Sequence, residues 1–264
     1  MMEQTGVRTP GGAGQERRCN LQAIAGVFPS RDDAERVFTT LRSSGVSATK
    51  IALLAPGDVR SKFQWNPVDG GGLSTGTTLV AVLVPGVGLV TGAGVLGIAI
   101  LRAAGAAIGA VASGSLEDGT EDLPEDEIFV YEHVLRKGRS VVIVLAEDGT
   151  AAEPVRQSFV EKGADAIDAA RQEWWIALRG PENEHYASSG RNFANDEKFY
   201  RLGFEAALHA RTRCKEFDQV SAEMTSKLED LEQQYPGVPI EEAFTRGYQR
   251  GREHFQALCD ERAA

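Results

Sequence analysis

Short apolar runs alternate with amphipathic segments along the first part of the chain. Residues 22–28 and 50–54 are mostly apolar, and the segment between them carries apolar side chains at helical spacing: Ala34, Val37, Phe38 and Leu41. This pattern predicts two buried strands with an amphipathic helix between them. Ser30 has the chemistry of a helix N-cap, and Gly45 is placed where helices commonly end. The segment therefore predicts a β-α-β unit.

The same order of elements recurs after residue 123. Residues 125–137 predict a helix, and residues 140–145 form an apolar, β-branched run that predicts a strand. A second amphipathic helix is expected to end at Gly163 and to be followed by a short edge strand over 164–169. Its predicted inward residues are Val155, Phe159 and Val160. The two halves together supply four strands and two packing helices, as in a ferredoxin-like split β-α-β sheet, an α+β fold.

Between the halves lies an apolar insert, residues 77–113, whose only charge is Arg102. Small residues at helical spacing allow helix backbones to approach closely, so we expect a Gly/Ala-rich helical hairpin that breaks at Pro85 and Gly86. The glycines predicted to pack in it are Gly88, Gly92, Gly97, Gly105 and Gly109. Strands on both sides of the insert require both of its ends to lie on one side of any membrane.

The length of the insert leaves three interpretations. Two membrane spans need about 40 residues and a turn, which exceeds the length of this stretch. We therefore favour a hairpin that is buried in a homo-oligomer or makes shallow, peripheral contact with one membrane leaflet. An integral membrane protein with a spanning hairpin is the alternative.

The last part of the chain predicts helices separated by polar turns. Residues 196–210, 220–234 and 240–258 have helical patterns, and 177–195 is rich in Gly, Pro, Ser and Asn, which indicates a linker. The motif aromatic-x-x-Gly-aromatic occurs twice, which predicts a close helix crossing at Gly203, Gly247 and Gly251. Trp174 and Trp175 precede this part, and we expect one of them to pack on the domain while the other covers a seam or a partner surface.

These patterns divide the chain into four segments. Residues 1–20 lack an apolar period and are expected to be a disordered tail. Residues 21–176 are expected to form the ferredoxin-like domain with the insert 77–113. The linker 177–195 then leads to a C-terminal all-helical domain of three helices, residues 196–264.

The order of these segments resembles the YflT-type general stress protein domain over residues 23–175. The resemblance rests on VFPSRDDAERVFTTLRSSGV, VPGVGLVTGAG, PEDEIFVYEHVLRKGRSVVIVLAED and AEPVRQSFVEKGADAIDAARQEWW. It implies a bacterial, stress-associated and non-enzymatic protein. The family has no established active site, so the resemblance transfers no catalytic residue to this chain. The C-terminal helices resemble a second module that accompanies stress-type domains in bacteria.

Charge and motifs narrow the functional classes. A formal net charge of -10 argues against a nucleic-acid partner. The sequence holds no nucleotide-binding loop, nucleophile elbow or paired-cysteine zinc motif, and we expect no catalytic, cofactor or metal residue. Three scattered cysteines and the absence of a signal peptide indicate the cytoplasm. The alternative is a metal- or small-ligand-binding protein that uses the acidic run 117–127 or Glu205 and His209.

Overall fold

The computed structural model describes residues 21–57, 79–105, 123–147, 152–188, 190–213 and 215–260. The predicted tail 1–20, Gly109, Cys19, Cys214 and the first part of the acidic run lie outside these residues. The elements in chain order are β1 (Leu21–Phe28), α1 (Arg31–Ser43), β2 (Ile51–Pro56), β3 (Leu79–Val84), β4 (Gly88–Ala93), α2 (Val95–Ala103), α3 (Ile128–Arg136), β5 (Ser140–Glu147), α4 (Ala152–Glu161), β6 (Asp165–Ala166), α5 (Ile167–Ala187), α6 (Phe193–Leu208), the 3-10 turn η2 (Phe217–Val220), α7 (Ser221–Gln234) and α8 (Ile240–Asp260).

The strands form one antiparallel, six-stranded sheet in the order β3-β4-β2-β5-β1-β6. The central strand β5 pairs with β1 on one side and with β2 on the other. Ile143, for example, lies opposite Ala25 in β1 and opposite Ala52 in β2. Strands from before and after the insert therefore share one layer, as the matching half-domains predict. The protein is an α+β protein.

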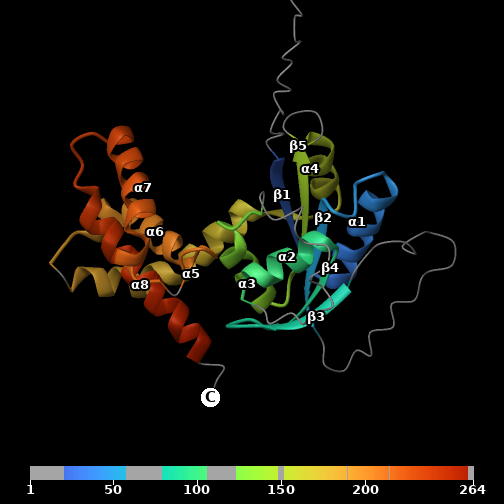
Figure 1. The fold of residues 1–264 in the computed structure, drawn as a ribbon, viewed down its shortest axis with the longest axis horizontal. Coiled ribbons are helices and arrows are strands. Elements are labelled where there is room, and N and C mark those ends of the chain that lie inside the picture. Colours follow the sequence, from blue (N-terminus) through green and yellow to red (C-terminus); the bar gives the residue numbers. More distant parts are fainter. Residues whose placement is uncertain are drawn as a thin grey trace, which may run out of the picture.

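Helices cover the two faces of the sheet unequally. Helices α1 and α4 pack on one face, over β1, β2 and β5. Helices α2, α3 and α5 pack on the other face, and α5 leads from the sheet to the helices α6, α7 and α8 (Figure 1). The local prediction for α1 is confirmed: Ser30 accepts a hydrogen bond from the backbone of Asp33, and its four predicted apolar residues are buried.

The predicted helical hairpin is wrong over its first half. Residues 79–93 form a β-hairpin of β3 and β4, and only Val95–Ala103 is helical. A continuous apolar run has no period that separates a strand from a buried helix. Here β2 offers a strand to which β4 pairs, from Leu53 opposite Ala93 to Pro56 opposite Val90. Gly costs about 0.5–1 kcal/mol relative to Ala in the interior of a helix or of a strand, so the glycine content does not decide between the two, and the pairing with β2 does.

Four smaller expectations also need correction. The stretch 177–195, predicted to be a linker, is helical as far as Ala187, because α5 continues through Pro181. The edge strand predicted over 164–169 contains two residues, after which α5 begins. The helix predicted over 125–137 begins at Ile128. Val160, predicted to face inward, is 69% exposed, whereas Val155 and Phe159 are buried as expected.

The core runs without interruption from the sheet into the C-terminal helices. One cluster of buried residues contains Val141 and Ile143 of β5 together with Trp175, Phe204 and Phe255 of the helices. A second cluster fills the space between the sheet and the helices α1 and α4. Among the described residues no helix has the length and apolarity that crossing a membrane requires.

Candidate interaction surface: the edge strand and its supports

Strand β3 is an edge of the sheet, and all six of its residues are apolar. Its backbone groups pair with β4 on one side, from Leu79 opposite Ala93 to Val84 opposite Gly88. An edge strand presents unpaired N–H and C=O groups on its other side, and proteins commonly protect such an edge with charge, proline or a bulge. The strand Leu79–Val84 carries no charged residue and no proline. This edge is chemically suited to pair with another strand.

The two faces of β3 differ in burial. Val80 and Val82 are half-buried against the core, and Val84 is buried. On the opposite face Ala81 is exposed and Leu83 is 72% exposed. Among the described elements, β4 and α2 are those with extensive contact to β3. Full burial of a leucine side chain contributes about 1.5–3 kcal/mol. An interaction that covers Leu83 would therefore gain free energy from removing this side chain from water.

The turn of the β3–β4 hairpin is attached to the C-terminal helix. A Cβ atom added to Gly86 would lie 3.5 Å from the Cβ atom of Leu258 in α8. Val84 and Val87, on either side of the turn, share a buried cluster with Phe255 of α8. The edge strand is therefore held in place by two elements: by β4 within the sheet and by α8 at the turn.

The four described glycines that were predicted to pack in the insert each lie in a different environment. Gly88 opens β4, and Gly92 lies under α2, where an added Cβ would come 2.6 Å from a methyl carbon of Leu101. Gly97 brings α2 close to β2, with Ala52 3.5 Å from its added Cβ, and Gly105 lies just after α2 beside Pro85. They permit a helix to pack on a sheet, not one helix on another, and Gly109 is outside the described residues.

The helix crossing predicted from the repeated motif lies between α6 and α8. An added Cβ on Gly203 would overlap the backbone carbonyl of Phe244, and one on Gly247 would overlap the carbonyl of Tyr200, both well under 3.0 Å. Gly251 lies against the backbone of Phe204, at 2.5 Å. The contacts are reciprocal, since each motif glycine meets the first aromatic residue of the other motif. The crossing requires glycine on both helices.

Trp174 and Trp175 do not form a partner surface, because each is only 2% exposed. Trp174 packs on Phe129 of α3 and on Phe204 of α6, with ring centroids 4.8 and 5.8 Å apart. Trp175 also contacts Phe204, and its indole N–H donates to Glu197 at 2.9 Å. The two rings close the seam between the sheet-bound helices and α6. Adjacent tryptophans alone do not distinguish an internal seam from an external one.

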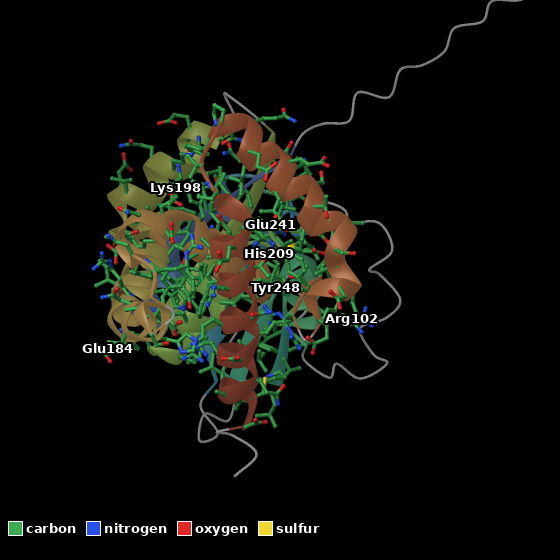
Figure 2. All side chains as sticks on the ribbon, turned by 90° about the vertical axis from the view of Figure 1, so that its left-hand side faces the viewer. Arg102, Glu184, Lys198, His209, Glu241 and Tyr248 are labelled. Carbon is green, nitrogen blue, oxygen red and sulfur yellow. The ribbon has the colours of Figure 1, made fainter. Side chains whose placement is uncertain are left out.

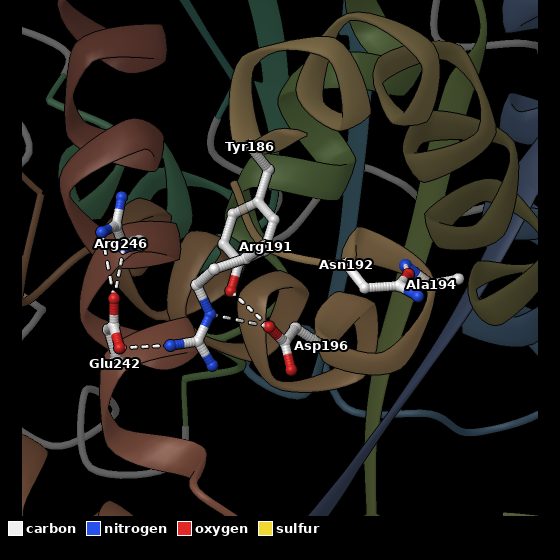
Figure 3. Close-up of polar contacts among 7 residues, drawn as sticks. All are labelled: Tyr186, Arg191, Asn192, Ala194, Asp196, Glu242 and Arg246. Carbon is white, nitrogen blue, oxygen red and sulfur yellow. Dashed lines mark hydrogen bonds and ion pairs between the residues drawn. The ribbon is translucent and has the colours of Figure 1, made fainter. Parts of the chain in front are cut away.

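Polar contacts fasten α8 to the connection between α5 and α6 (Figure 3). Asp196 accepts hydrogen bonds from the Tyr186 hydroxyl at 2.7 Å and from Arg191 at 3.0 Å. Arg191 also forms an ion pair with Glu242 of α8, which Arg246 contacts as well. Figure 3 shows these side chains as a chain of contacts from α5 to α8. Each charged side chain in this network has a partner of opposite charge, which indicates that the network has a structural role.

Glu205 and His209, the candidate metal pair, do not form a metal site. Glu205 accepts from Arg171 at 3.2 Å and from Arg201 at 2.6 Å, so both of its carboxylate oxygens are engaged by guanidinium groups. His209 is the C-cap residue of α6. In the described ranges no group of three or more His, Cys, Asp or Glu side chains is arranged to hold a metal ion.

The sequence does not predict two features of the region where α3 meets the C-terminal helices. Arg213 donates to Glu132 of α3 at 2.7 Å, and both side chains are nearly buried. Burial lowers the pKa of His133 in α3, His209 and His254 in α8 to about 4 in each case. Both the ion pair and the burial of the histidines depend on elements that are far apart in the chain, so the spacing of residues along the sequence could not predict them.

The three half-buried histidines, His133, His209 and His254, predict a loss of stability in mild acid. Their folded-state pKa lies below the unfolded value of about 6.5, so the unfolded chain takes up protons first, and the free energy of unfolding falls as the pH drops from about 6.5 toward 4. Each histidine contributes on the order of 1–3 kcal/mol to this fall, less where water reaches the ring. The raised pKa values of Glu127 and Glu132, caused by burial, oppose it in part.

Urea unfolding between pH 7 and pH 5 measures this slope. We expect His254→Gln to make the slope shallower, because burial, and after it the charges of Arg136, Arg250 and His133, lower the pKa of this imidazole. His185 is exposed, so His185→Gln should leave the slope unchanged. Equal slopes for the parent chain and for His254→Gln would contradict the assignment.

No family model, curated protein or solved structure matches this chain. The fold defines an α+β protein with an antiparallel sheet, an apolar edge strand and a set of C-terminal helices packed on its core.

Proposed function

We propose that this chain is a non-enzymatic bacterial stress-response protein that acts by self-association through the β3–β4 hairpin. The observation that carries this proposal is the uncharged edge strand β3 with Leu83 exposed. The order of segments that resembles the YflT-type general stress protein domain supports the stress-response part. The tightly packed Gly/Ala insert remains the functional element, although its first half is a β-hairpin and not a helical one.

A ferredoxin-like plan for the central sheet is part of the proposal. Strands β6, β1, β5 and β2 are neighbours in that order, and α1 and α4 pack on one face of them. That arrangement suits two β-α-β halves that interlock. On this plan β3, β4, α2 and α3 are an insertion between the halves that extends the sheet by two strands beyond β2. We further propose that α6, α7 and α8 form a helical domain that supports the inserted hairpin through α8.

Self-association is favoured over membrane contact by the geometry of the exposed apolar residues. A membrane-surface element presents a broad apolar face, commonly with cationic residues beside it. Here β3 exposes one large apolar side chain, Leu83, and the nearest charged residue of the insert is Arg102, which lies at the outside of the molecule in Figure 2. A strand edge is suited to bind another strand, which supplies both hydrogen bonds and apolar cover.

Light scattering of the full-length chain after gel filtration tests the proposal. We expect a mass above that of the monomer for the parent chain, and a shift to monomer for Leu83→Lys, because a charge on the exposed face of an edge strand opposes pairing. Val160→Lys is the matched control, since Val160 is 69% exposed on α4 and far from the hairpin in sequence. A parent chain that is monomeric at every concentration would sink the proposal.

Flotation with vesicles of neutral and anionic phospholipid separates the membrane alternative. On the proposal, the parent chain stays with the protein fraction in both cases. Co-flotation that Leu83→Lys abolishes and Val160→Lys preserves would instead assign the hairpin to a lipid surface.

A further inference from the structure

We propose that the partner of β3 is β3 of a second copy, paired antiparallel across a two-fold axis perpendicular to the sheet. This inference rests on the proposed function and specifies its interface. The two copies together would form one continuous sheet, with the edge strands of both copies at its centre.

The other edge of the sheet, β6, is not suited to pair with β3 of a second copy, which leaves β3 as the partner strand. At that edge, β6 contains two residues, and α5 begins directly after it. Asp165 of β6 also forms an ion pair with Arg139, which places charge at this edge. A short, charged edge does not accept another strand. Head-to-tail stacking of β3 on β6, which would give a fibre, is therefore blocked, and pairing through β3 alone closes at two copies.

The distribution of charge restricts where two copies can meet. The chain carries a formal net charge of -10, so two copies repel each other over most of their surfaces. Strand β3 and the turn after it, from Leu79 to Val87, contain no charged residue. Two copies that meet at this strand bring uncharged segments together, so their acidic surfaces need not come into contact.

The alternation of side chains restricts the register. A two-fold axis perpendicular to the sheet leaves the same face of both copies on the same side of the joint sheet. Two residues that lie opposite each other must therefore point their side chains to the same face. Leu79, Ala81 and Leu83 share one face of β3, and Val80 and Val82 share the other. Centring the pair on Ala81 puts Ala81 opposite its own counterpart and Leu83 opposite the second copy's Leu79. This register covers the exposed Leu83 with a leucine.

Disulfide trapping tests both the partner and the register. In a full-length chain with Cys19, Cys214 and Cys259 replaced by Ser, Ala81→Cys should form a cross-linked dimer on mild oxidation, because opposite residues bring their Cβ atoms within disulfide range. Leu83→Cys alone should cross-link at least tenfold more slowly, and a mixture of Leu79→Cys and Leu83→Cys chains should cross-link readily.

Val160→Cys is the control for random collision, since its side chain is about as exposed as that of Leu83. Parallel pairing of two free β3 edges would turn one copy over, so same-numbered side chains would lie on opposite faces of the joint sheet. Cross-linking in a mixture of Ala81→Cys and Val82→Cys chains, with none for Ala81→Cys alone, would therefore overturn the antiparallel assignment. A dimer by light scattering in which Ala81→Cys reacts no faster than Val160→Cys would overturn the β3 interface while leaving self-association intact. A monomer at every concentration, with no trapped dimer, would overturn both.

Discussion

Replacing Gly247 with alanine is expected to lower the free energy of unfolding by about 3 kcal/mol or more. The added Cβ would overlap the carbonyl oxygen and carbon of Tyr200 in α6, and backbone atoms cannot move aside as a flexible side chain can. Relieving the overlap requires α6 and α8 to separate, which would open the packing of Phe204 and Tyr248. The loss is measured by urea unfolding followed by far-UV circular dichroism and tryptophan fluorescence.

The control is a glycine on a helix with free space around it. Gly180 lies within α5, and an added Cβ there would meet no atom of another element within 4 Å. Alanine has a higher helix propensity than glycine, but its Cβ also crowds the ring of the following Pro181, so Gly180→Ala should change the free energy of unfolding by less than about 1 kcal/mol. Gly203→Ala should behave like Gly247→Ala, since its Cβ meets the Phe244 carbonyl. A stabilising Gly247→Ala would show that α6 and α8 do not cross at this point.

Removing Arg213 is the second change with a large expected effect. Its guanidinium donates to Glu132 at 2.7 Å and to the Leu208 carbonyl at 3.0 Å, and it lies over the Phe255 ring. The side chains of Arg213 and Glu132 are 8% and 7% exposed. Breaking one partner of a buried ion pair costs about 3–5 kcal/mol, because the other charge stays buried without compensation. We therefore expect Arg213→Met to destabilise the protein by about this amount.

The pH dependence of this loss distinguishes a charge effect from a packing effect. Burial already raises the pKa of Glu132, and Arg213 is the main group that lowers it again. Without Arg213 the pKa of Glu132 should rise further, so the carboxyl takes up a proton more readily in the folded state. The destabilisation should therefore shrink as the pH falls, whereas a loss of packing alone would be independent of pH.

Two further variants complete the measurement. Glu132→Leu combined with Arg213→Met removes both charges and should recover most of the stability that either change loses alone. Lys137 pairs with Glu173 at 3.2 Å on the surface, with both side chains about half exposed, so Lys137→Met should cost less than about 1 kcal/mol. A double variant as unstable as Arg213→Met would mean that the lost packing, not the stranded carboxylate, dominates.

Much of the sheet region could be predicted from local patterns. The N-cap at Ser30, the buried positions of α1 and the apolar strand β5 depend on residues close together in the chain. The same holds for α7 and α8, which are bounded by the turn around Pro236. These features require only a helical period, a capping side chain or a β-branched run, and the sequence shows all three directly.

The insert and the seam could not be predicted in this way. Residues 79–93 are apolar throughout, so no period shows whether they form a helix or strands, and the outcome depends on the free edge of β2. A signal was present, since valines at alternate positions, Val80, Val82 and Val84, precede a Pro-Gly turn. The burial of Trp174 and Trp175 depends on α6, which follows them after the long helix α5.

The sequence by itself determined which segments are helices or strands wherever one face of an element is polar, because the contrast between faces is written into consecutive residues. It also determined that the motif glycines meet in a close crossing, as two aromatic-x-x-Gly-aromatic motifs indicate. Only the tertiary structure decided that the apolar insert extends the sheet, that β3 is its edge, and that Glu132 meets Arg213. Those outcomes depend on which surfaces distant segments offer to each other, and a uniform apolar run or a single charge does not encode its partner.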